Sequence, residues 1–149
     1  MTDFKPAGYG TVTPYLPVEG AERVIEFAKR ALDATERLRL PGPEGSVGHA
    51  ELQIGDSVVM LGDVRDPADA MPGMLHLYVE DCDAAYARAL EAGATTTREP
   101  RDEFYGDRMA GVRDPVGNVW YFATHVEDVS DDEMVRRAGE RADGSEERA

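Results

Sequence analysis

Two stretches of the chain carry apolar residues at the spacing of an α-helix with one buried face. The first set is Val24, Phe27, Ala28, Ala31 and Leu32. The second set is Cys82, Ala85, Tyr86, Ala89 and Leu90. Spacings of three and four residues place all members of a set on one side of a helix. The pattern therefore predicts two amphipathic helices, the second of them capped by Asp81.

Segments rich in β-branched and aromatic residues surround each of these helices. The segment 11–18 precedes the first helix, and its two prolines indicate a strand at the edge of a sheet. The other predicted strands, separated by turn residues, cover 36–40, 48–54, 57–61, 74–79, 95–98, 108–112 and 119–123. The order β-α-β-β-β therefore occurs twice.

The two predicted units also match each other in sequence. Val18 and Val79 are 61 residues apart, and Arg30-Ala-Leu-Asp-Ala34 resembles Arg88-Ala-Leu-Glu-Ala92. We predict an α+β fold with two tandem β-α-β-β-β units, about 9–63 and 74–126, in one domain over 9–126. A generic α+β domain in which this similarity is accidental is the alternative.

Composition and charge narrow the possible partners. The chain has 149 residues, which suits one domain, and a formal net charge of -14. Nucleic-acid backbones and anionic membranes attract clustered positive charge, so neither is expected as a partner. Cys82 is the only cysteine, and the first residues contain no apolar run. These features predict a cytoplasmic protein.

Residues 127–149 are predicted to be an acidic C-terminal helix followed by a frayed tail. Ser130 and Glu133 have the S-x-x-E spacing of a capping box, which predicts a short helix near 131–139. The residues that follow are almost entirely polar or small, so they are expected to fray.

Four segments carry a resemblance to a known family. They are Thr13-Pro-Tyr-Leu-Pro-Val18, Gly48-His-Ala-Glu-Leu-Gln-Ile-Gly-Asp-Ser57, Val79-Glu-Asp-Cys-Asp83 and Tyr105-Gly-Asp-Arg-Met-Ala-Gly-Val-Arg-Asp-Pro-Val-Gly-Asn-Val-Trp120. Over roughly 9–139 the chain resembles the vicinal oxygen chelate superfamily, which contains glyoxalase I, bleomycin-resistance proteins and extradiol dioxygenases. Within it, the chain is most similar to the PhnB-like branch. Two departures, Asp33 for a usual glycine and Asn118 for a common histidine, leave the expected fold unchanged, since Asp tolerates left-handed backbone.

This resemblance implies an open curved sheet around a central pocket, with the helices outside. It also implies, as in many members, a homodimer in which each pocket draws residues from both chains. Metal-binding members place ligands, usually His and Glu, at the positions of Thr13, Met60, Met74 and Tyr121. Hydroxyl and thioether groups are poor ligands for Zn, Ni, Mn or Fe. We therefore expect no metal and no other cofactor.

Strand alternation predicts the side chains that line the pocket, because successive residues point to opposite faces of a sheet. The predicted ligand-binding residues are Thr13, His49, Glu51, Met60, Met74, His76, Tyr78, Met109 and Tyr121. Each also has a purely structural interpretation. The histidines are consistent with hydrogen-bonded surface positions, Glu51 with an ion pair, and the methionines with packing.

Two classes of function remain. The first is a metal-independent small-molecule binding protein of the glyoxalase/bleomycin-resistance type, acting in drug or metabolite sequestration. Its expected ligand is cationic or aromatic, because Glu51 is the one carboxylate on the pocket side and the body of the protein is acidic. The second is an enzyme, a lyase, isomerase or dioxygenase, with a displaced site around His49, Glu51 and His76 and with Tyr121 as a proton donor.

Overall fold

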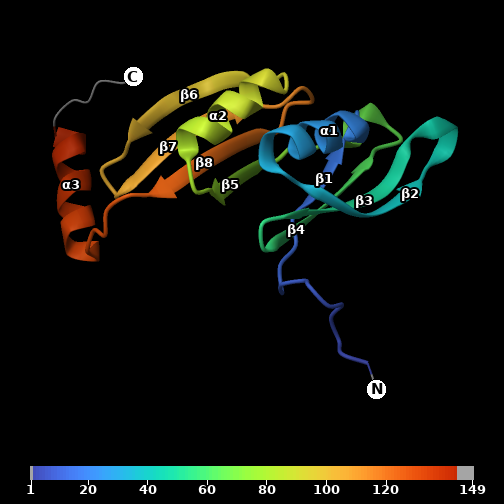
Figure 1. The fold of residues 1–149 in the computed structure, drawn as a ribbon, viewed down its shortest axis with the longest axis horizontal. Helices are drawn as coiled ribbons and strands as arrows, with labels where there is room; N and C mark the ends of the chain where they lie inside the picture. Colours follow the sequence, from blue (N-terminus) through green and yellow to red (C-terminus); the bar gives the residue numbers. More distant parts are fainter. Residues whose placement is uncertain (1, 144–149) are drawn as a thin grey trace.

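The computed structural model describes residues 2–143 and contains two consecutive β-α-β-β-β units (Figure 1). The first unit consists of β1 (Tyr15–Val18), α1 (Ala21–Leu32), β2 (Thr35–Pro41), β3 (Val47–Ile54) and β4 (Ser57–Asp63). The second consists of β5 (Met74–Tyr78), α2 (Cys82–Glu91), β6 (Thr95–Asp102), β7 (Asp107–Arg113) and β8 (Val119–His125). The predicted α+β class and the predicted duplication are confirmed.

Each unit forms its own four-stranded mixed sheet. The strand orders are β1-β4-β3-β2 and β5-β8-β7-β6, and in each sheet the first pair is parallel while the others are antiparallel. A parallel pair needs a long crossover connection, which α1 and α2 provide. The strand β1 lies at a sheet edge, as its prolines predict.

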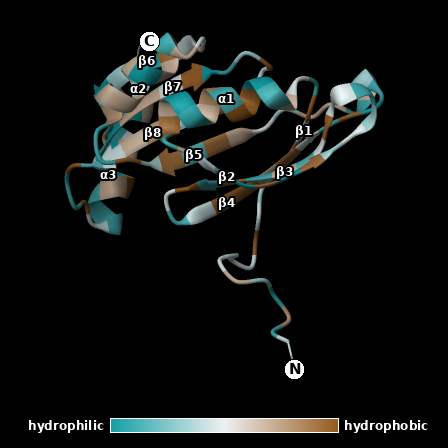
Figure 2. Cartoon of the chain, turned by 45° about the vertical axis from the view of Figure 1, so that its right-hand side comes forward, coloured by the Kyte–Doolittle hydropathy of each residue, from teal (hydrophilic) through white to brown (hydrophobic). Residues whose placement is uncertain are grey.

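Both helices bury the face that their apolar spacing predicts. In α1, the side chains of Val24, Phe27, Ala28 and Ala31 are buried, and the ribbon of α1 alternates between hydrophobic and hydrophilic positions (Figure 2). The helix ends at Asp33, whose φ of 53° lies in the left-handed region. The expectation that Asp takes the place of a glycine here is confirmed. In α2, Cys82, Ala85 and Ala89 are buried as predicted, whereas Leu90, which the spacing placed on the same face, is 37% exposed.

The two units share one hydrophobic core through their helices. The ring of Phe27 on α1 packs against the fully buried ring of Trp120 on β8, with 5.7 Å between centroids. Arg30 donates to the carbonyl of Glu91 at 2.9 Å, and Arg88 donates to the carbonyl of Ala31 at 3.2 Å. The matching Arg residues of the repeat thus each bind a carbonyl near the C-terminal end of the other unit's helix, where positive charge is favourable.

Equivalent positions at the ends of β4 and β8 hold the start of each helix. The carboxylate of Asp63 accepts hydrogen bonds from the N–H groups of Gly20 and Ala21 at 2.9 and 2.8 Å. Sixty-one residues later, the Thr124 hydroxyl accepts from the N–H of Cys82 at 2.9 Å. Burial alone raises the pKa of Asp63, but the N–H donors of Ala21, Val47 and Gly20 outweigh it and keep the pKa below its usual value.

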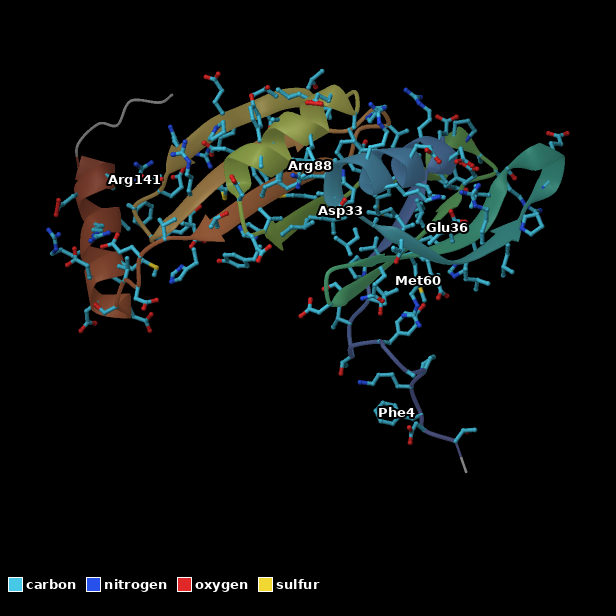
Figure 3. The ribbon with its side chains drawn as sticks, viewed as in Figure 1. Phe4, Asp33, Glu36, Met60, Arg88 and Arg141 are labelled. Carbon is cyan, nitrogen blue, oxygen red and sulfur yellow. The ribbon has the colours of Figure 1, made fainter. Side chains whose placement is uncertain are left out.

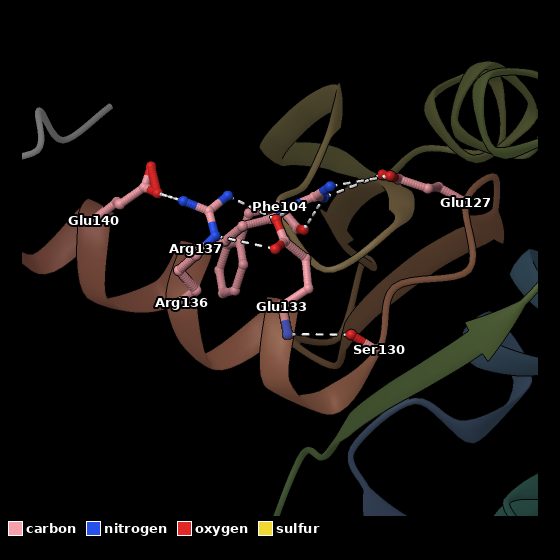
Figure 4. Close-up of polar contacts among 7 residues, drawn as sticks. All are labelled: Phe104, Glu127, Ser130, Glu133, Arg136, Arg137 and Glu140. Carbon is pink, nitrogen blue, oxygen red and sulfur yellow. Dashed lines mark hydrogen bonds and ion pairs between the residues drawn. The ribbon is translucent and has the colours of Figure 1, made fainter.

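The C-terminal helix α3 (Asp131–Asp143) is longer than the sequence predicts and is held to the second sheet by Arg137 (Figure 4). This guanidinium donates to the carbonyl of Phe104 at 2.9 Å and pairs with Glu127 and Glu133 at 3.0 and 2.8 Å. The N–H of Glu133 bonds the Ser130 hydroxyl at 3.2 Å, as the capping box predicts. Residues 139–143 were expected to fray but are helical, while the rest of the predicted tail, 144–149, lies outside the described residues.

None of the helices among residues 2–143 is long and apolar enough to cross a membrane.

The buried carboxylate of Asp114 organises the hairpin between β7 and β8. It accepts from the N–H groups of Val116 and Asn118, from the Asn118 amide and from the Trp120 indole, at 2.8–2.9 Å.

Asp114→Ala leaves these donors without a partner, and we expect it to lower the free energy of unfolding by roughly 2–4 kcal/mol in urea denaturation. The matched control is Asp56→Ala in the exposed hairpin between β3 and β4, expected within about 0.5 kcal/mol of wild type. Equal losses in the two variants would contradict the role of Asp114.

Candidate functional site

The strand register determines which side chains lie opposite the helices. In the first sheet, Tyr15 pairs with Met60, and Met60 pairs with Glu51. Their neighbours along each strand, Leu16, Leu61 and Leu52, are buried beneath α1. Because alternate residues point to opposite faces, Tyr15, Met60 and Glu51 share the face that no helix of this unit covers. We call this surface the open face of the sheet.

His49 and Glu51 lie side by side on the open face of the first sheet. The Nε2 atom of His49 is 3.1 Å from a Glu51 carboxylate oxygen, and the Tyr15 ring stacks on the imidazole with 5.9 Å between centroids. The glutamate side chain is 16% exposed. Contacts with Tyr9 and, second, with His49 hold the pKa of Glu51 below its usual value, so the carboxylate stays ionised at neutral pH.

Tyr9 belongs to this half of the site, although no sequence pattern indicated it. It lies in the arm 2–14, which runs from β1 away from both sheets toward Phe4 (Figure 3). The guanidinium of Arg37 on β2 lies 5.0 Å from the centre of the Tyr9 ring and donates to the carbonyl of Ala7 at 3.2 Å. The Tyr9 hydroxyl is buried beside Glu51 and makes no hydrogen bond of ordinary geometry within the described part of the chain.

The second sheet carries the other predicted residues on its open face. His76 pairs with Tyr121, 61 residues after the pair Tyr15 and Met60. Met74 and Tyr78 are 66% and 67% exposed, and the rings of His76 and Tyr78 meet edge to face at 5.2 Å. A Cβ atom on Gly111 would lie 2.7 Å from the Tyr121 ring. Glycine is therefore required where this ring crosses β7.

Two of the predicted residues are placed differently from the others. Met109 is buried, because the hydroxyl of Tyr105 covers its sulfur at 3.2 Å. Thr13 precedes β1 and is half-buried. The Met109 side chain is therefore buried beneath the open face.

A buried carboxylate that the sequence analysis missed supports Tyr78. Asp107 is 3% exposed and accepts the Tyr78 hydroxyl at 2.8 Å. Its second oxygen contacts Nδ1 of His125 at 2.9 Å, and Nε2 of His125 lies 2.8 Å from Asp128. Asp107 raises the pKa of Tyr78 and, together with Asp128, that of His125. Alternation from Met109 would have placed Asp107 on the same face, but its partners come from distant parts of the chain.

The two halves differ chemically at equivalent positions. Met60 corresponds to Tyr121, so Glu51, the partner of Met60, corresponds to Gly111, the partner of Tyr121. Two residues earlier on each strand, His49 corresponds to Met109. At these two positions the first half carries an ionic pair, whereas the second half carries a glycine and a thioether.

A cleft of about 640 Å³ lies between the two units. Residues of β5 line one side of it, and among them His76 and Tyr78 are predicted site residues. Apolar walls come from Leu32, Ile54, Val59, Leu75, Leu77 and Val79. Asp33, Asp56, Glu80 and Asp81 bring negative charge, and Arg88 is the one arginine or lysine among the lining residues. Figure 3 labels Asp33 and Arg88. The cleft is therefore more suited to apolar or cationic groups than to anions.

The donor set does not fit the metal site that the resemblance implies. The corresponding positions hold Thr13, Met60, Met74 and Tyr121, of which none is a carboxylate or imidazole. Within residues 2–143, no three His, Cys, Asp or Glu side chains are grouped so that they could hold a metal ion. The structure joins His49 to Glu51 but does not bring His76 to them within one chain.

A family model and several relatives match most of the chain. The model of the Glyoxalase/Bleomycin resistance protein/Dioxygenase superfamily matches residues 9–122. An uncharacterized protein of Mycobacterium bovis is 36% identical over 144 residues, which cover 89% of this chain and 95% of that protein. An uncharacterized protein of Mycobacterium tuberculosis is also 36% identical, over 89% of this chain and 85% of its own length.

Solved structures share the fold. The crystal structure of TioX from Micromonospora sp. ML1 matches with a TM-score of 0.67 and 25% identity, over 78% of this chain and 99% of that one. A glyoxalase/bleomycin resistance protein/dioxygenase from Nocardioides matches with a TM-score of 0.61 and 21% identity, over 87% and 90% of the two chains.

The misfit of the donor set leads to a prediction about metal content. Purified protein incubated with Zn, Ni, Mn or Fe salts and then desalted is expected to retain far less than one equivalent of metal per chain, measured by elemental analysis. A chelator is expected to leave the melting temperature unchanged, because no ion stabilises the folded state. One tightly held equivalent, lost in the double variant His49→Ala/Glu51→Ala, would point instead to a displaced metal site.

Proposed function

Because the chain belongs to the Glyoxalase/Bleomycin resistance protein/Dioxygenase superfamily, we propose that it is a metal-independent small-molecule binding protein. The observation that carries this proposal is the chemistry of the open faces. Soft and aromatic side chains, Met60, Met74 and Tyr121, stand at three of the positions that hold metal ligands in metal-binding members. Such side chains provide adaptable contacts for flat or irregular ligands. Sequestration of a drug or metabolite is the role that fits such a site.

A second copy of the chain is the proposed partner. Tyr15, Leu38 and Leu40 on the first sheet are 47%, 41% and 48% exposed, and Met74 and Tyr78 on the second are more exposed still. Large apolar side chains gathered on open faces indicate an interaction surface. A homodimer that brings the open face of the first sheet opposite the open face of the partner's second sheet would cover them and enclose a ligand. We also retain the PhnB-like branch as the proposed position within the superfamily.

The proposed ligand has a flat apolar body and a positive or hydrogen-bond-donating group. The chain carries a net charge of -14, and Glu51 is an ionised carboxylate on the open face of the first sheet, near the guanidinium of Arg37. Because His49 already contacts Glu51, a cation must share or replace that contact. The ring of Tyr15, which stacks on His49, adds attraction for a cation through its π-electrons.

An enzyme is the second candidate, supported by the contact between His49 and Glu51. A histidine held by a carboxylate can exchange a proton with a bound substrate. His76, the third residue of the displaced site, would have to come from the partner chain.

Binding measurements distinguish these candidates. By calorimetry, cationic aromatic compounds are expected to bind more tightly than neutral aromatics, and glutathione conjugates are expected to bind least. Glu51→Gln is expected to weaken cation binding by about one to two decades, since charge-assisted hydrogen bonds contribute roughly 1.5–3 kcal/mol. The control, Glu44→Gln, makes the same charge change at an exposed loop position. Preferential binding of glutathione conjugates would overturn the ligand class, and consumption of methylglyoxal with glutathione would favour the enzyme.

The association state is a separate prediction. Light scattering at micromolar concentration is expected to give twice the 16.3 kDa mass of the chain. Replacing Leu38 and Leu40 by Glu is expected to shift the equilibrium toward monomer, because it places charge in the buried interface. The control, Val135→Glu, changes a more exposed apolar residue on α3, 73% exposed, and is expected to leave the dimer intact. A monomeric wild type would contradict the proposed partner.

A further inference from the structure

Tyr78 lies where a ligand of the proposed site would meet the second sheet. It is two-thirds exposed, it stands on the open face, and it lines the cleft between the units. Its ring contacts that of His76 edge to face. The Tyr78 side chain is therefore accessible to a ligand on the open face of the second sheet.

The O–H bond of Tyr78 points toward a single acceptor in the protein. Its proton is donated to Asp107 Oδ2 at 2.8 Å, and the second oxygen of Asp107 is occupied by His125. An ionised carboxylate accepts hydrogen bonds and cannot donate one. Asp107 is almost completely buried, so turning the hydroxyl proton toward another acceptor would leave its Oδ2 atom without the Tyr78 donor.

This geometry leaves only the lone pairs of the Tyr78 oxygen for a ligand. We infer that Asp107 is a positioning residue that makes Tyr78 an obligate hydrogen-bond acceptor, so that the site selects aromatic ligands carrying an O–H or N–H donor. The inference rests on the proposed small-molecule binding function and adds a rule of selection to it. The rule is independent of ligand charge, and neutral donors satisfy it as well as cationic ones.

The variant Asp107→Asn reverses the arrangement without changing its shape. His125 donates from one ring nitrogen, so the single oxygen of the Asn amide stays with the imidazole. The amide N–H₂ group then faces Tyr78 and donates to it. The hydroxyl proton of Tyr78 is released and can be given to a ligand that only accepts.

The experiment compares two neutral probes of similar shape, 2-naphthol, which can donate, and 2-methoxynaphthalene, which can only accept. Wild type is expected to bind the naphthol about fivefold to tenfold more tightly, the value of one hydrogen bond. Asp107→Asn is expected to bring this ratio to about one or below. Tyr78→Phe is also expected to bring it to about one, while retaining the binding of both aromatic bodies.

The ratio of the affinities for the two probes distinguishes a positioning role of Asp107 from a general loss of folding stability. Loss of stability in Asp107→Asn lowers the binding of both probes equally and leaves their ratio unchanged. Asp102→Asn, an exposed carboxylate on β6 that pairs with Arg108, makes the same charge change and is expected to keep the wild-type ratio. If wild type binds both probes equally, or if the ratio survives in Tyr78→Phe, the inference is wrong and the binding function stands. If wild type binds neither probe, both fail.

Discussion

The burial of one face of each sheet beneath its helix is the constraint on which the rest of this structure depends. Alternate residues of β4 and β8, such as Leu61 and Phe122, are completely buried in the shared core. Since strand side chains alternate, the residues between them, Met60 and Tyr121, have to lie on the opposite face. A shift of one residue in the pairing would expose the core and bury the candidate site. The position of the site is therefore a consequence of core packing.

The way in which the units join explains why both open faces remain uncovered in one chain. The helices of the two units contact each other, with Phe27 packed on Trp120 and with Arg30 and Arg88 reaching the ends of the opposite helices. The shared core thus lies on the helix side of both sheets. Burial of apolar area provides the main free energy that holds the units together, and none of it comes from the open faces.

Periodicity and turn chemistry were enough to predict the fold, because both are properties of short segments. The apolar spacings, the left-handed Asp33 and the order of the strands all follow from residues near one another in sequence. The site was predicted less completely, since its supporting contacts join distant segments. Tyr9 comes from an arm without periodicity, and the contact between Asp107 and His125 depends on the register of two strands. Met109 was assigned to the correct face, but no local pattern indicates that the Tyr105 side chain covers it.

The unequal chemistry of the two duplicated halves has a consequence for recognition. A pocket built from two equal halves would be symmetric under rotation, and an elongated molecule could enter it in either of two orientations with the same energy. Here an end-for-end turn would exchange an ionised Glu51 for the bare backbone of Gly111, and a histidine for a thioether. The degeneracy is removed by these few side chains. A duplicated scaffold can in this way distinguish the head of a molecule from its tail without giving up the symmetry of its backbone.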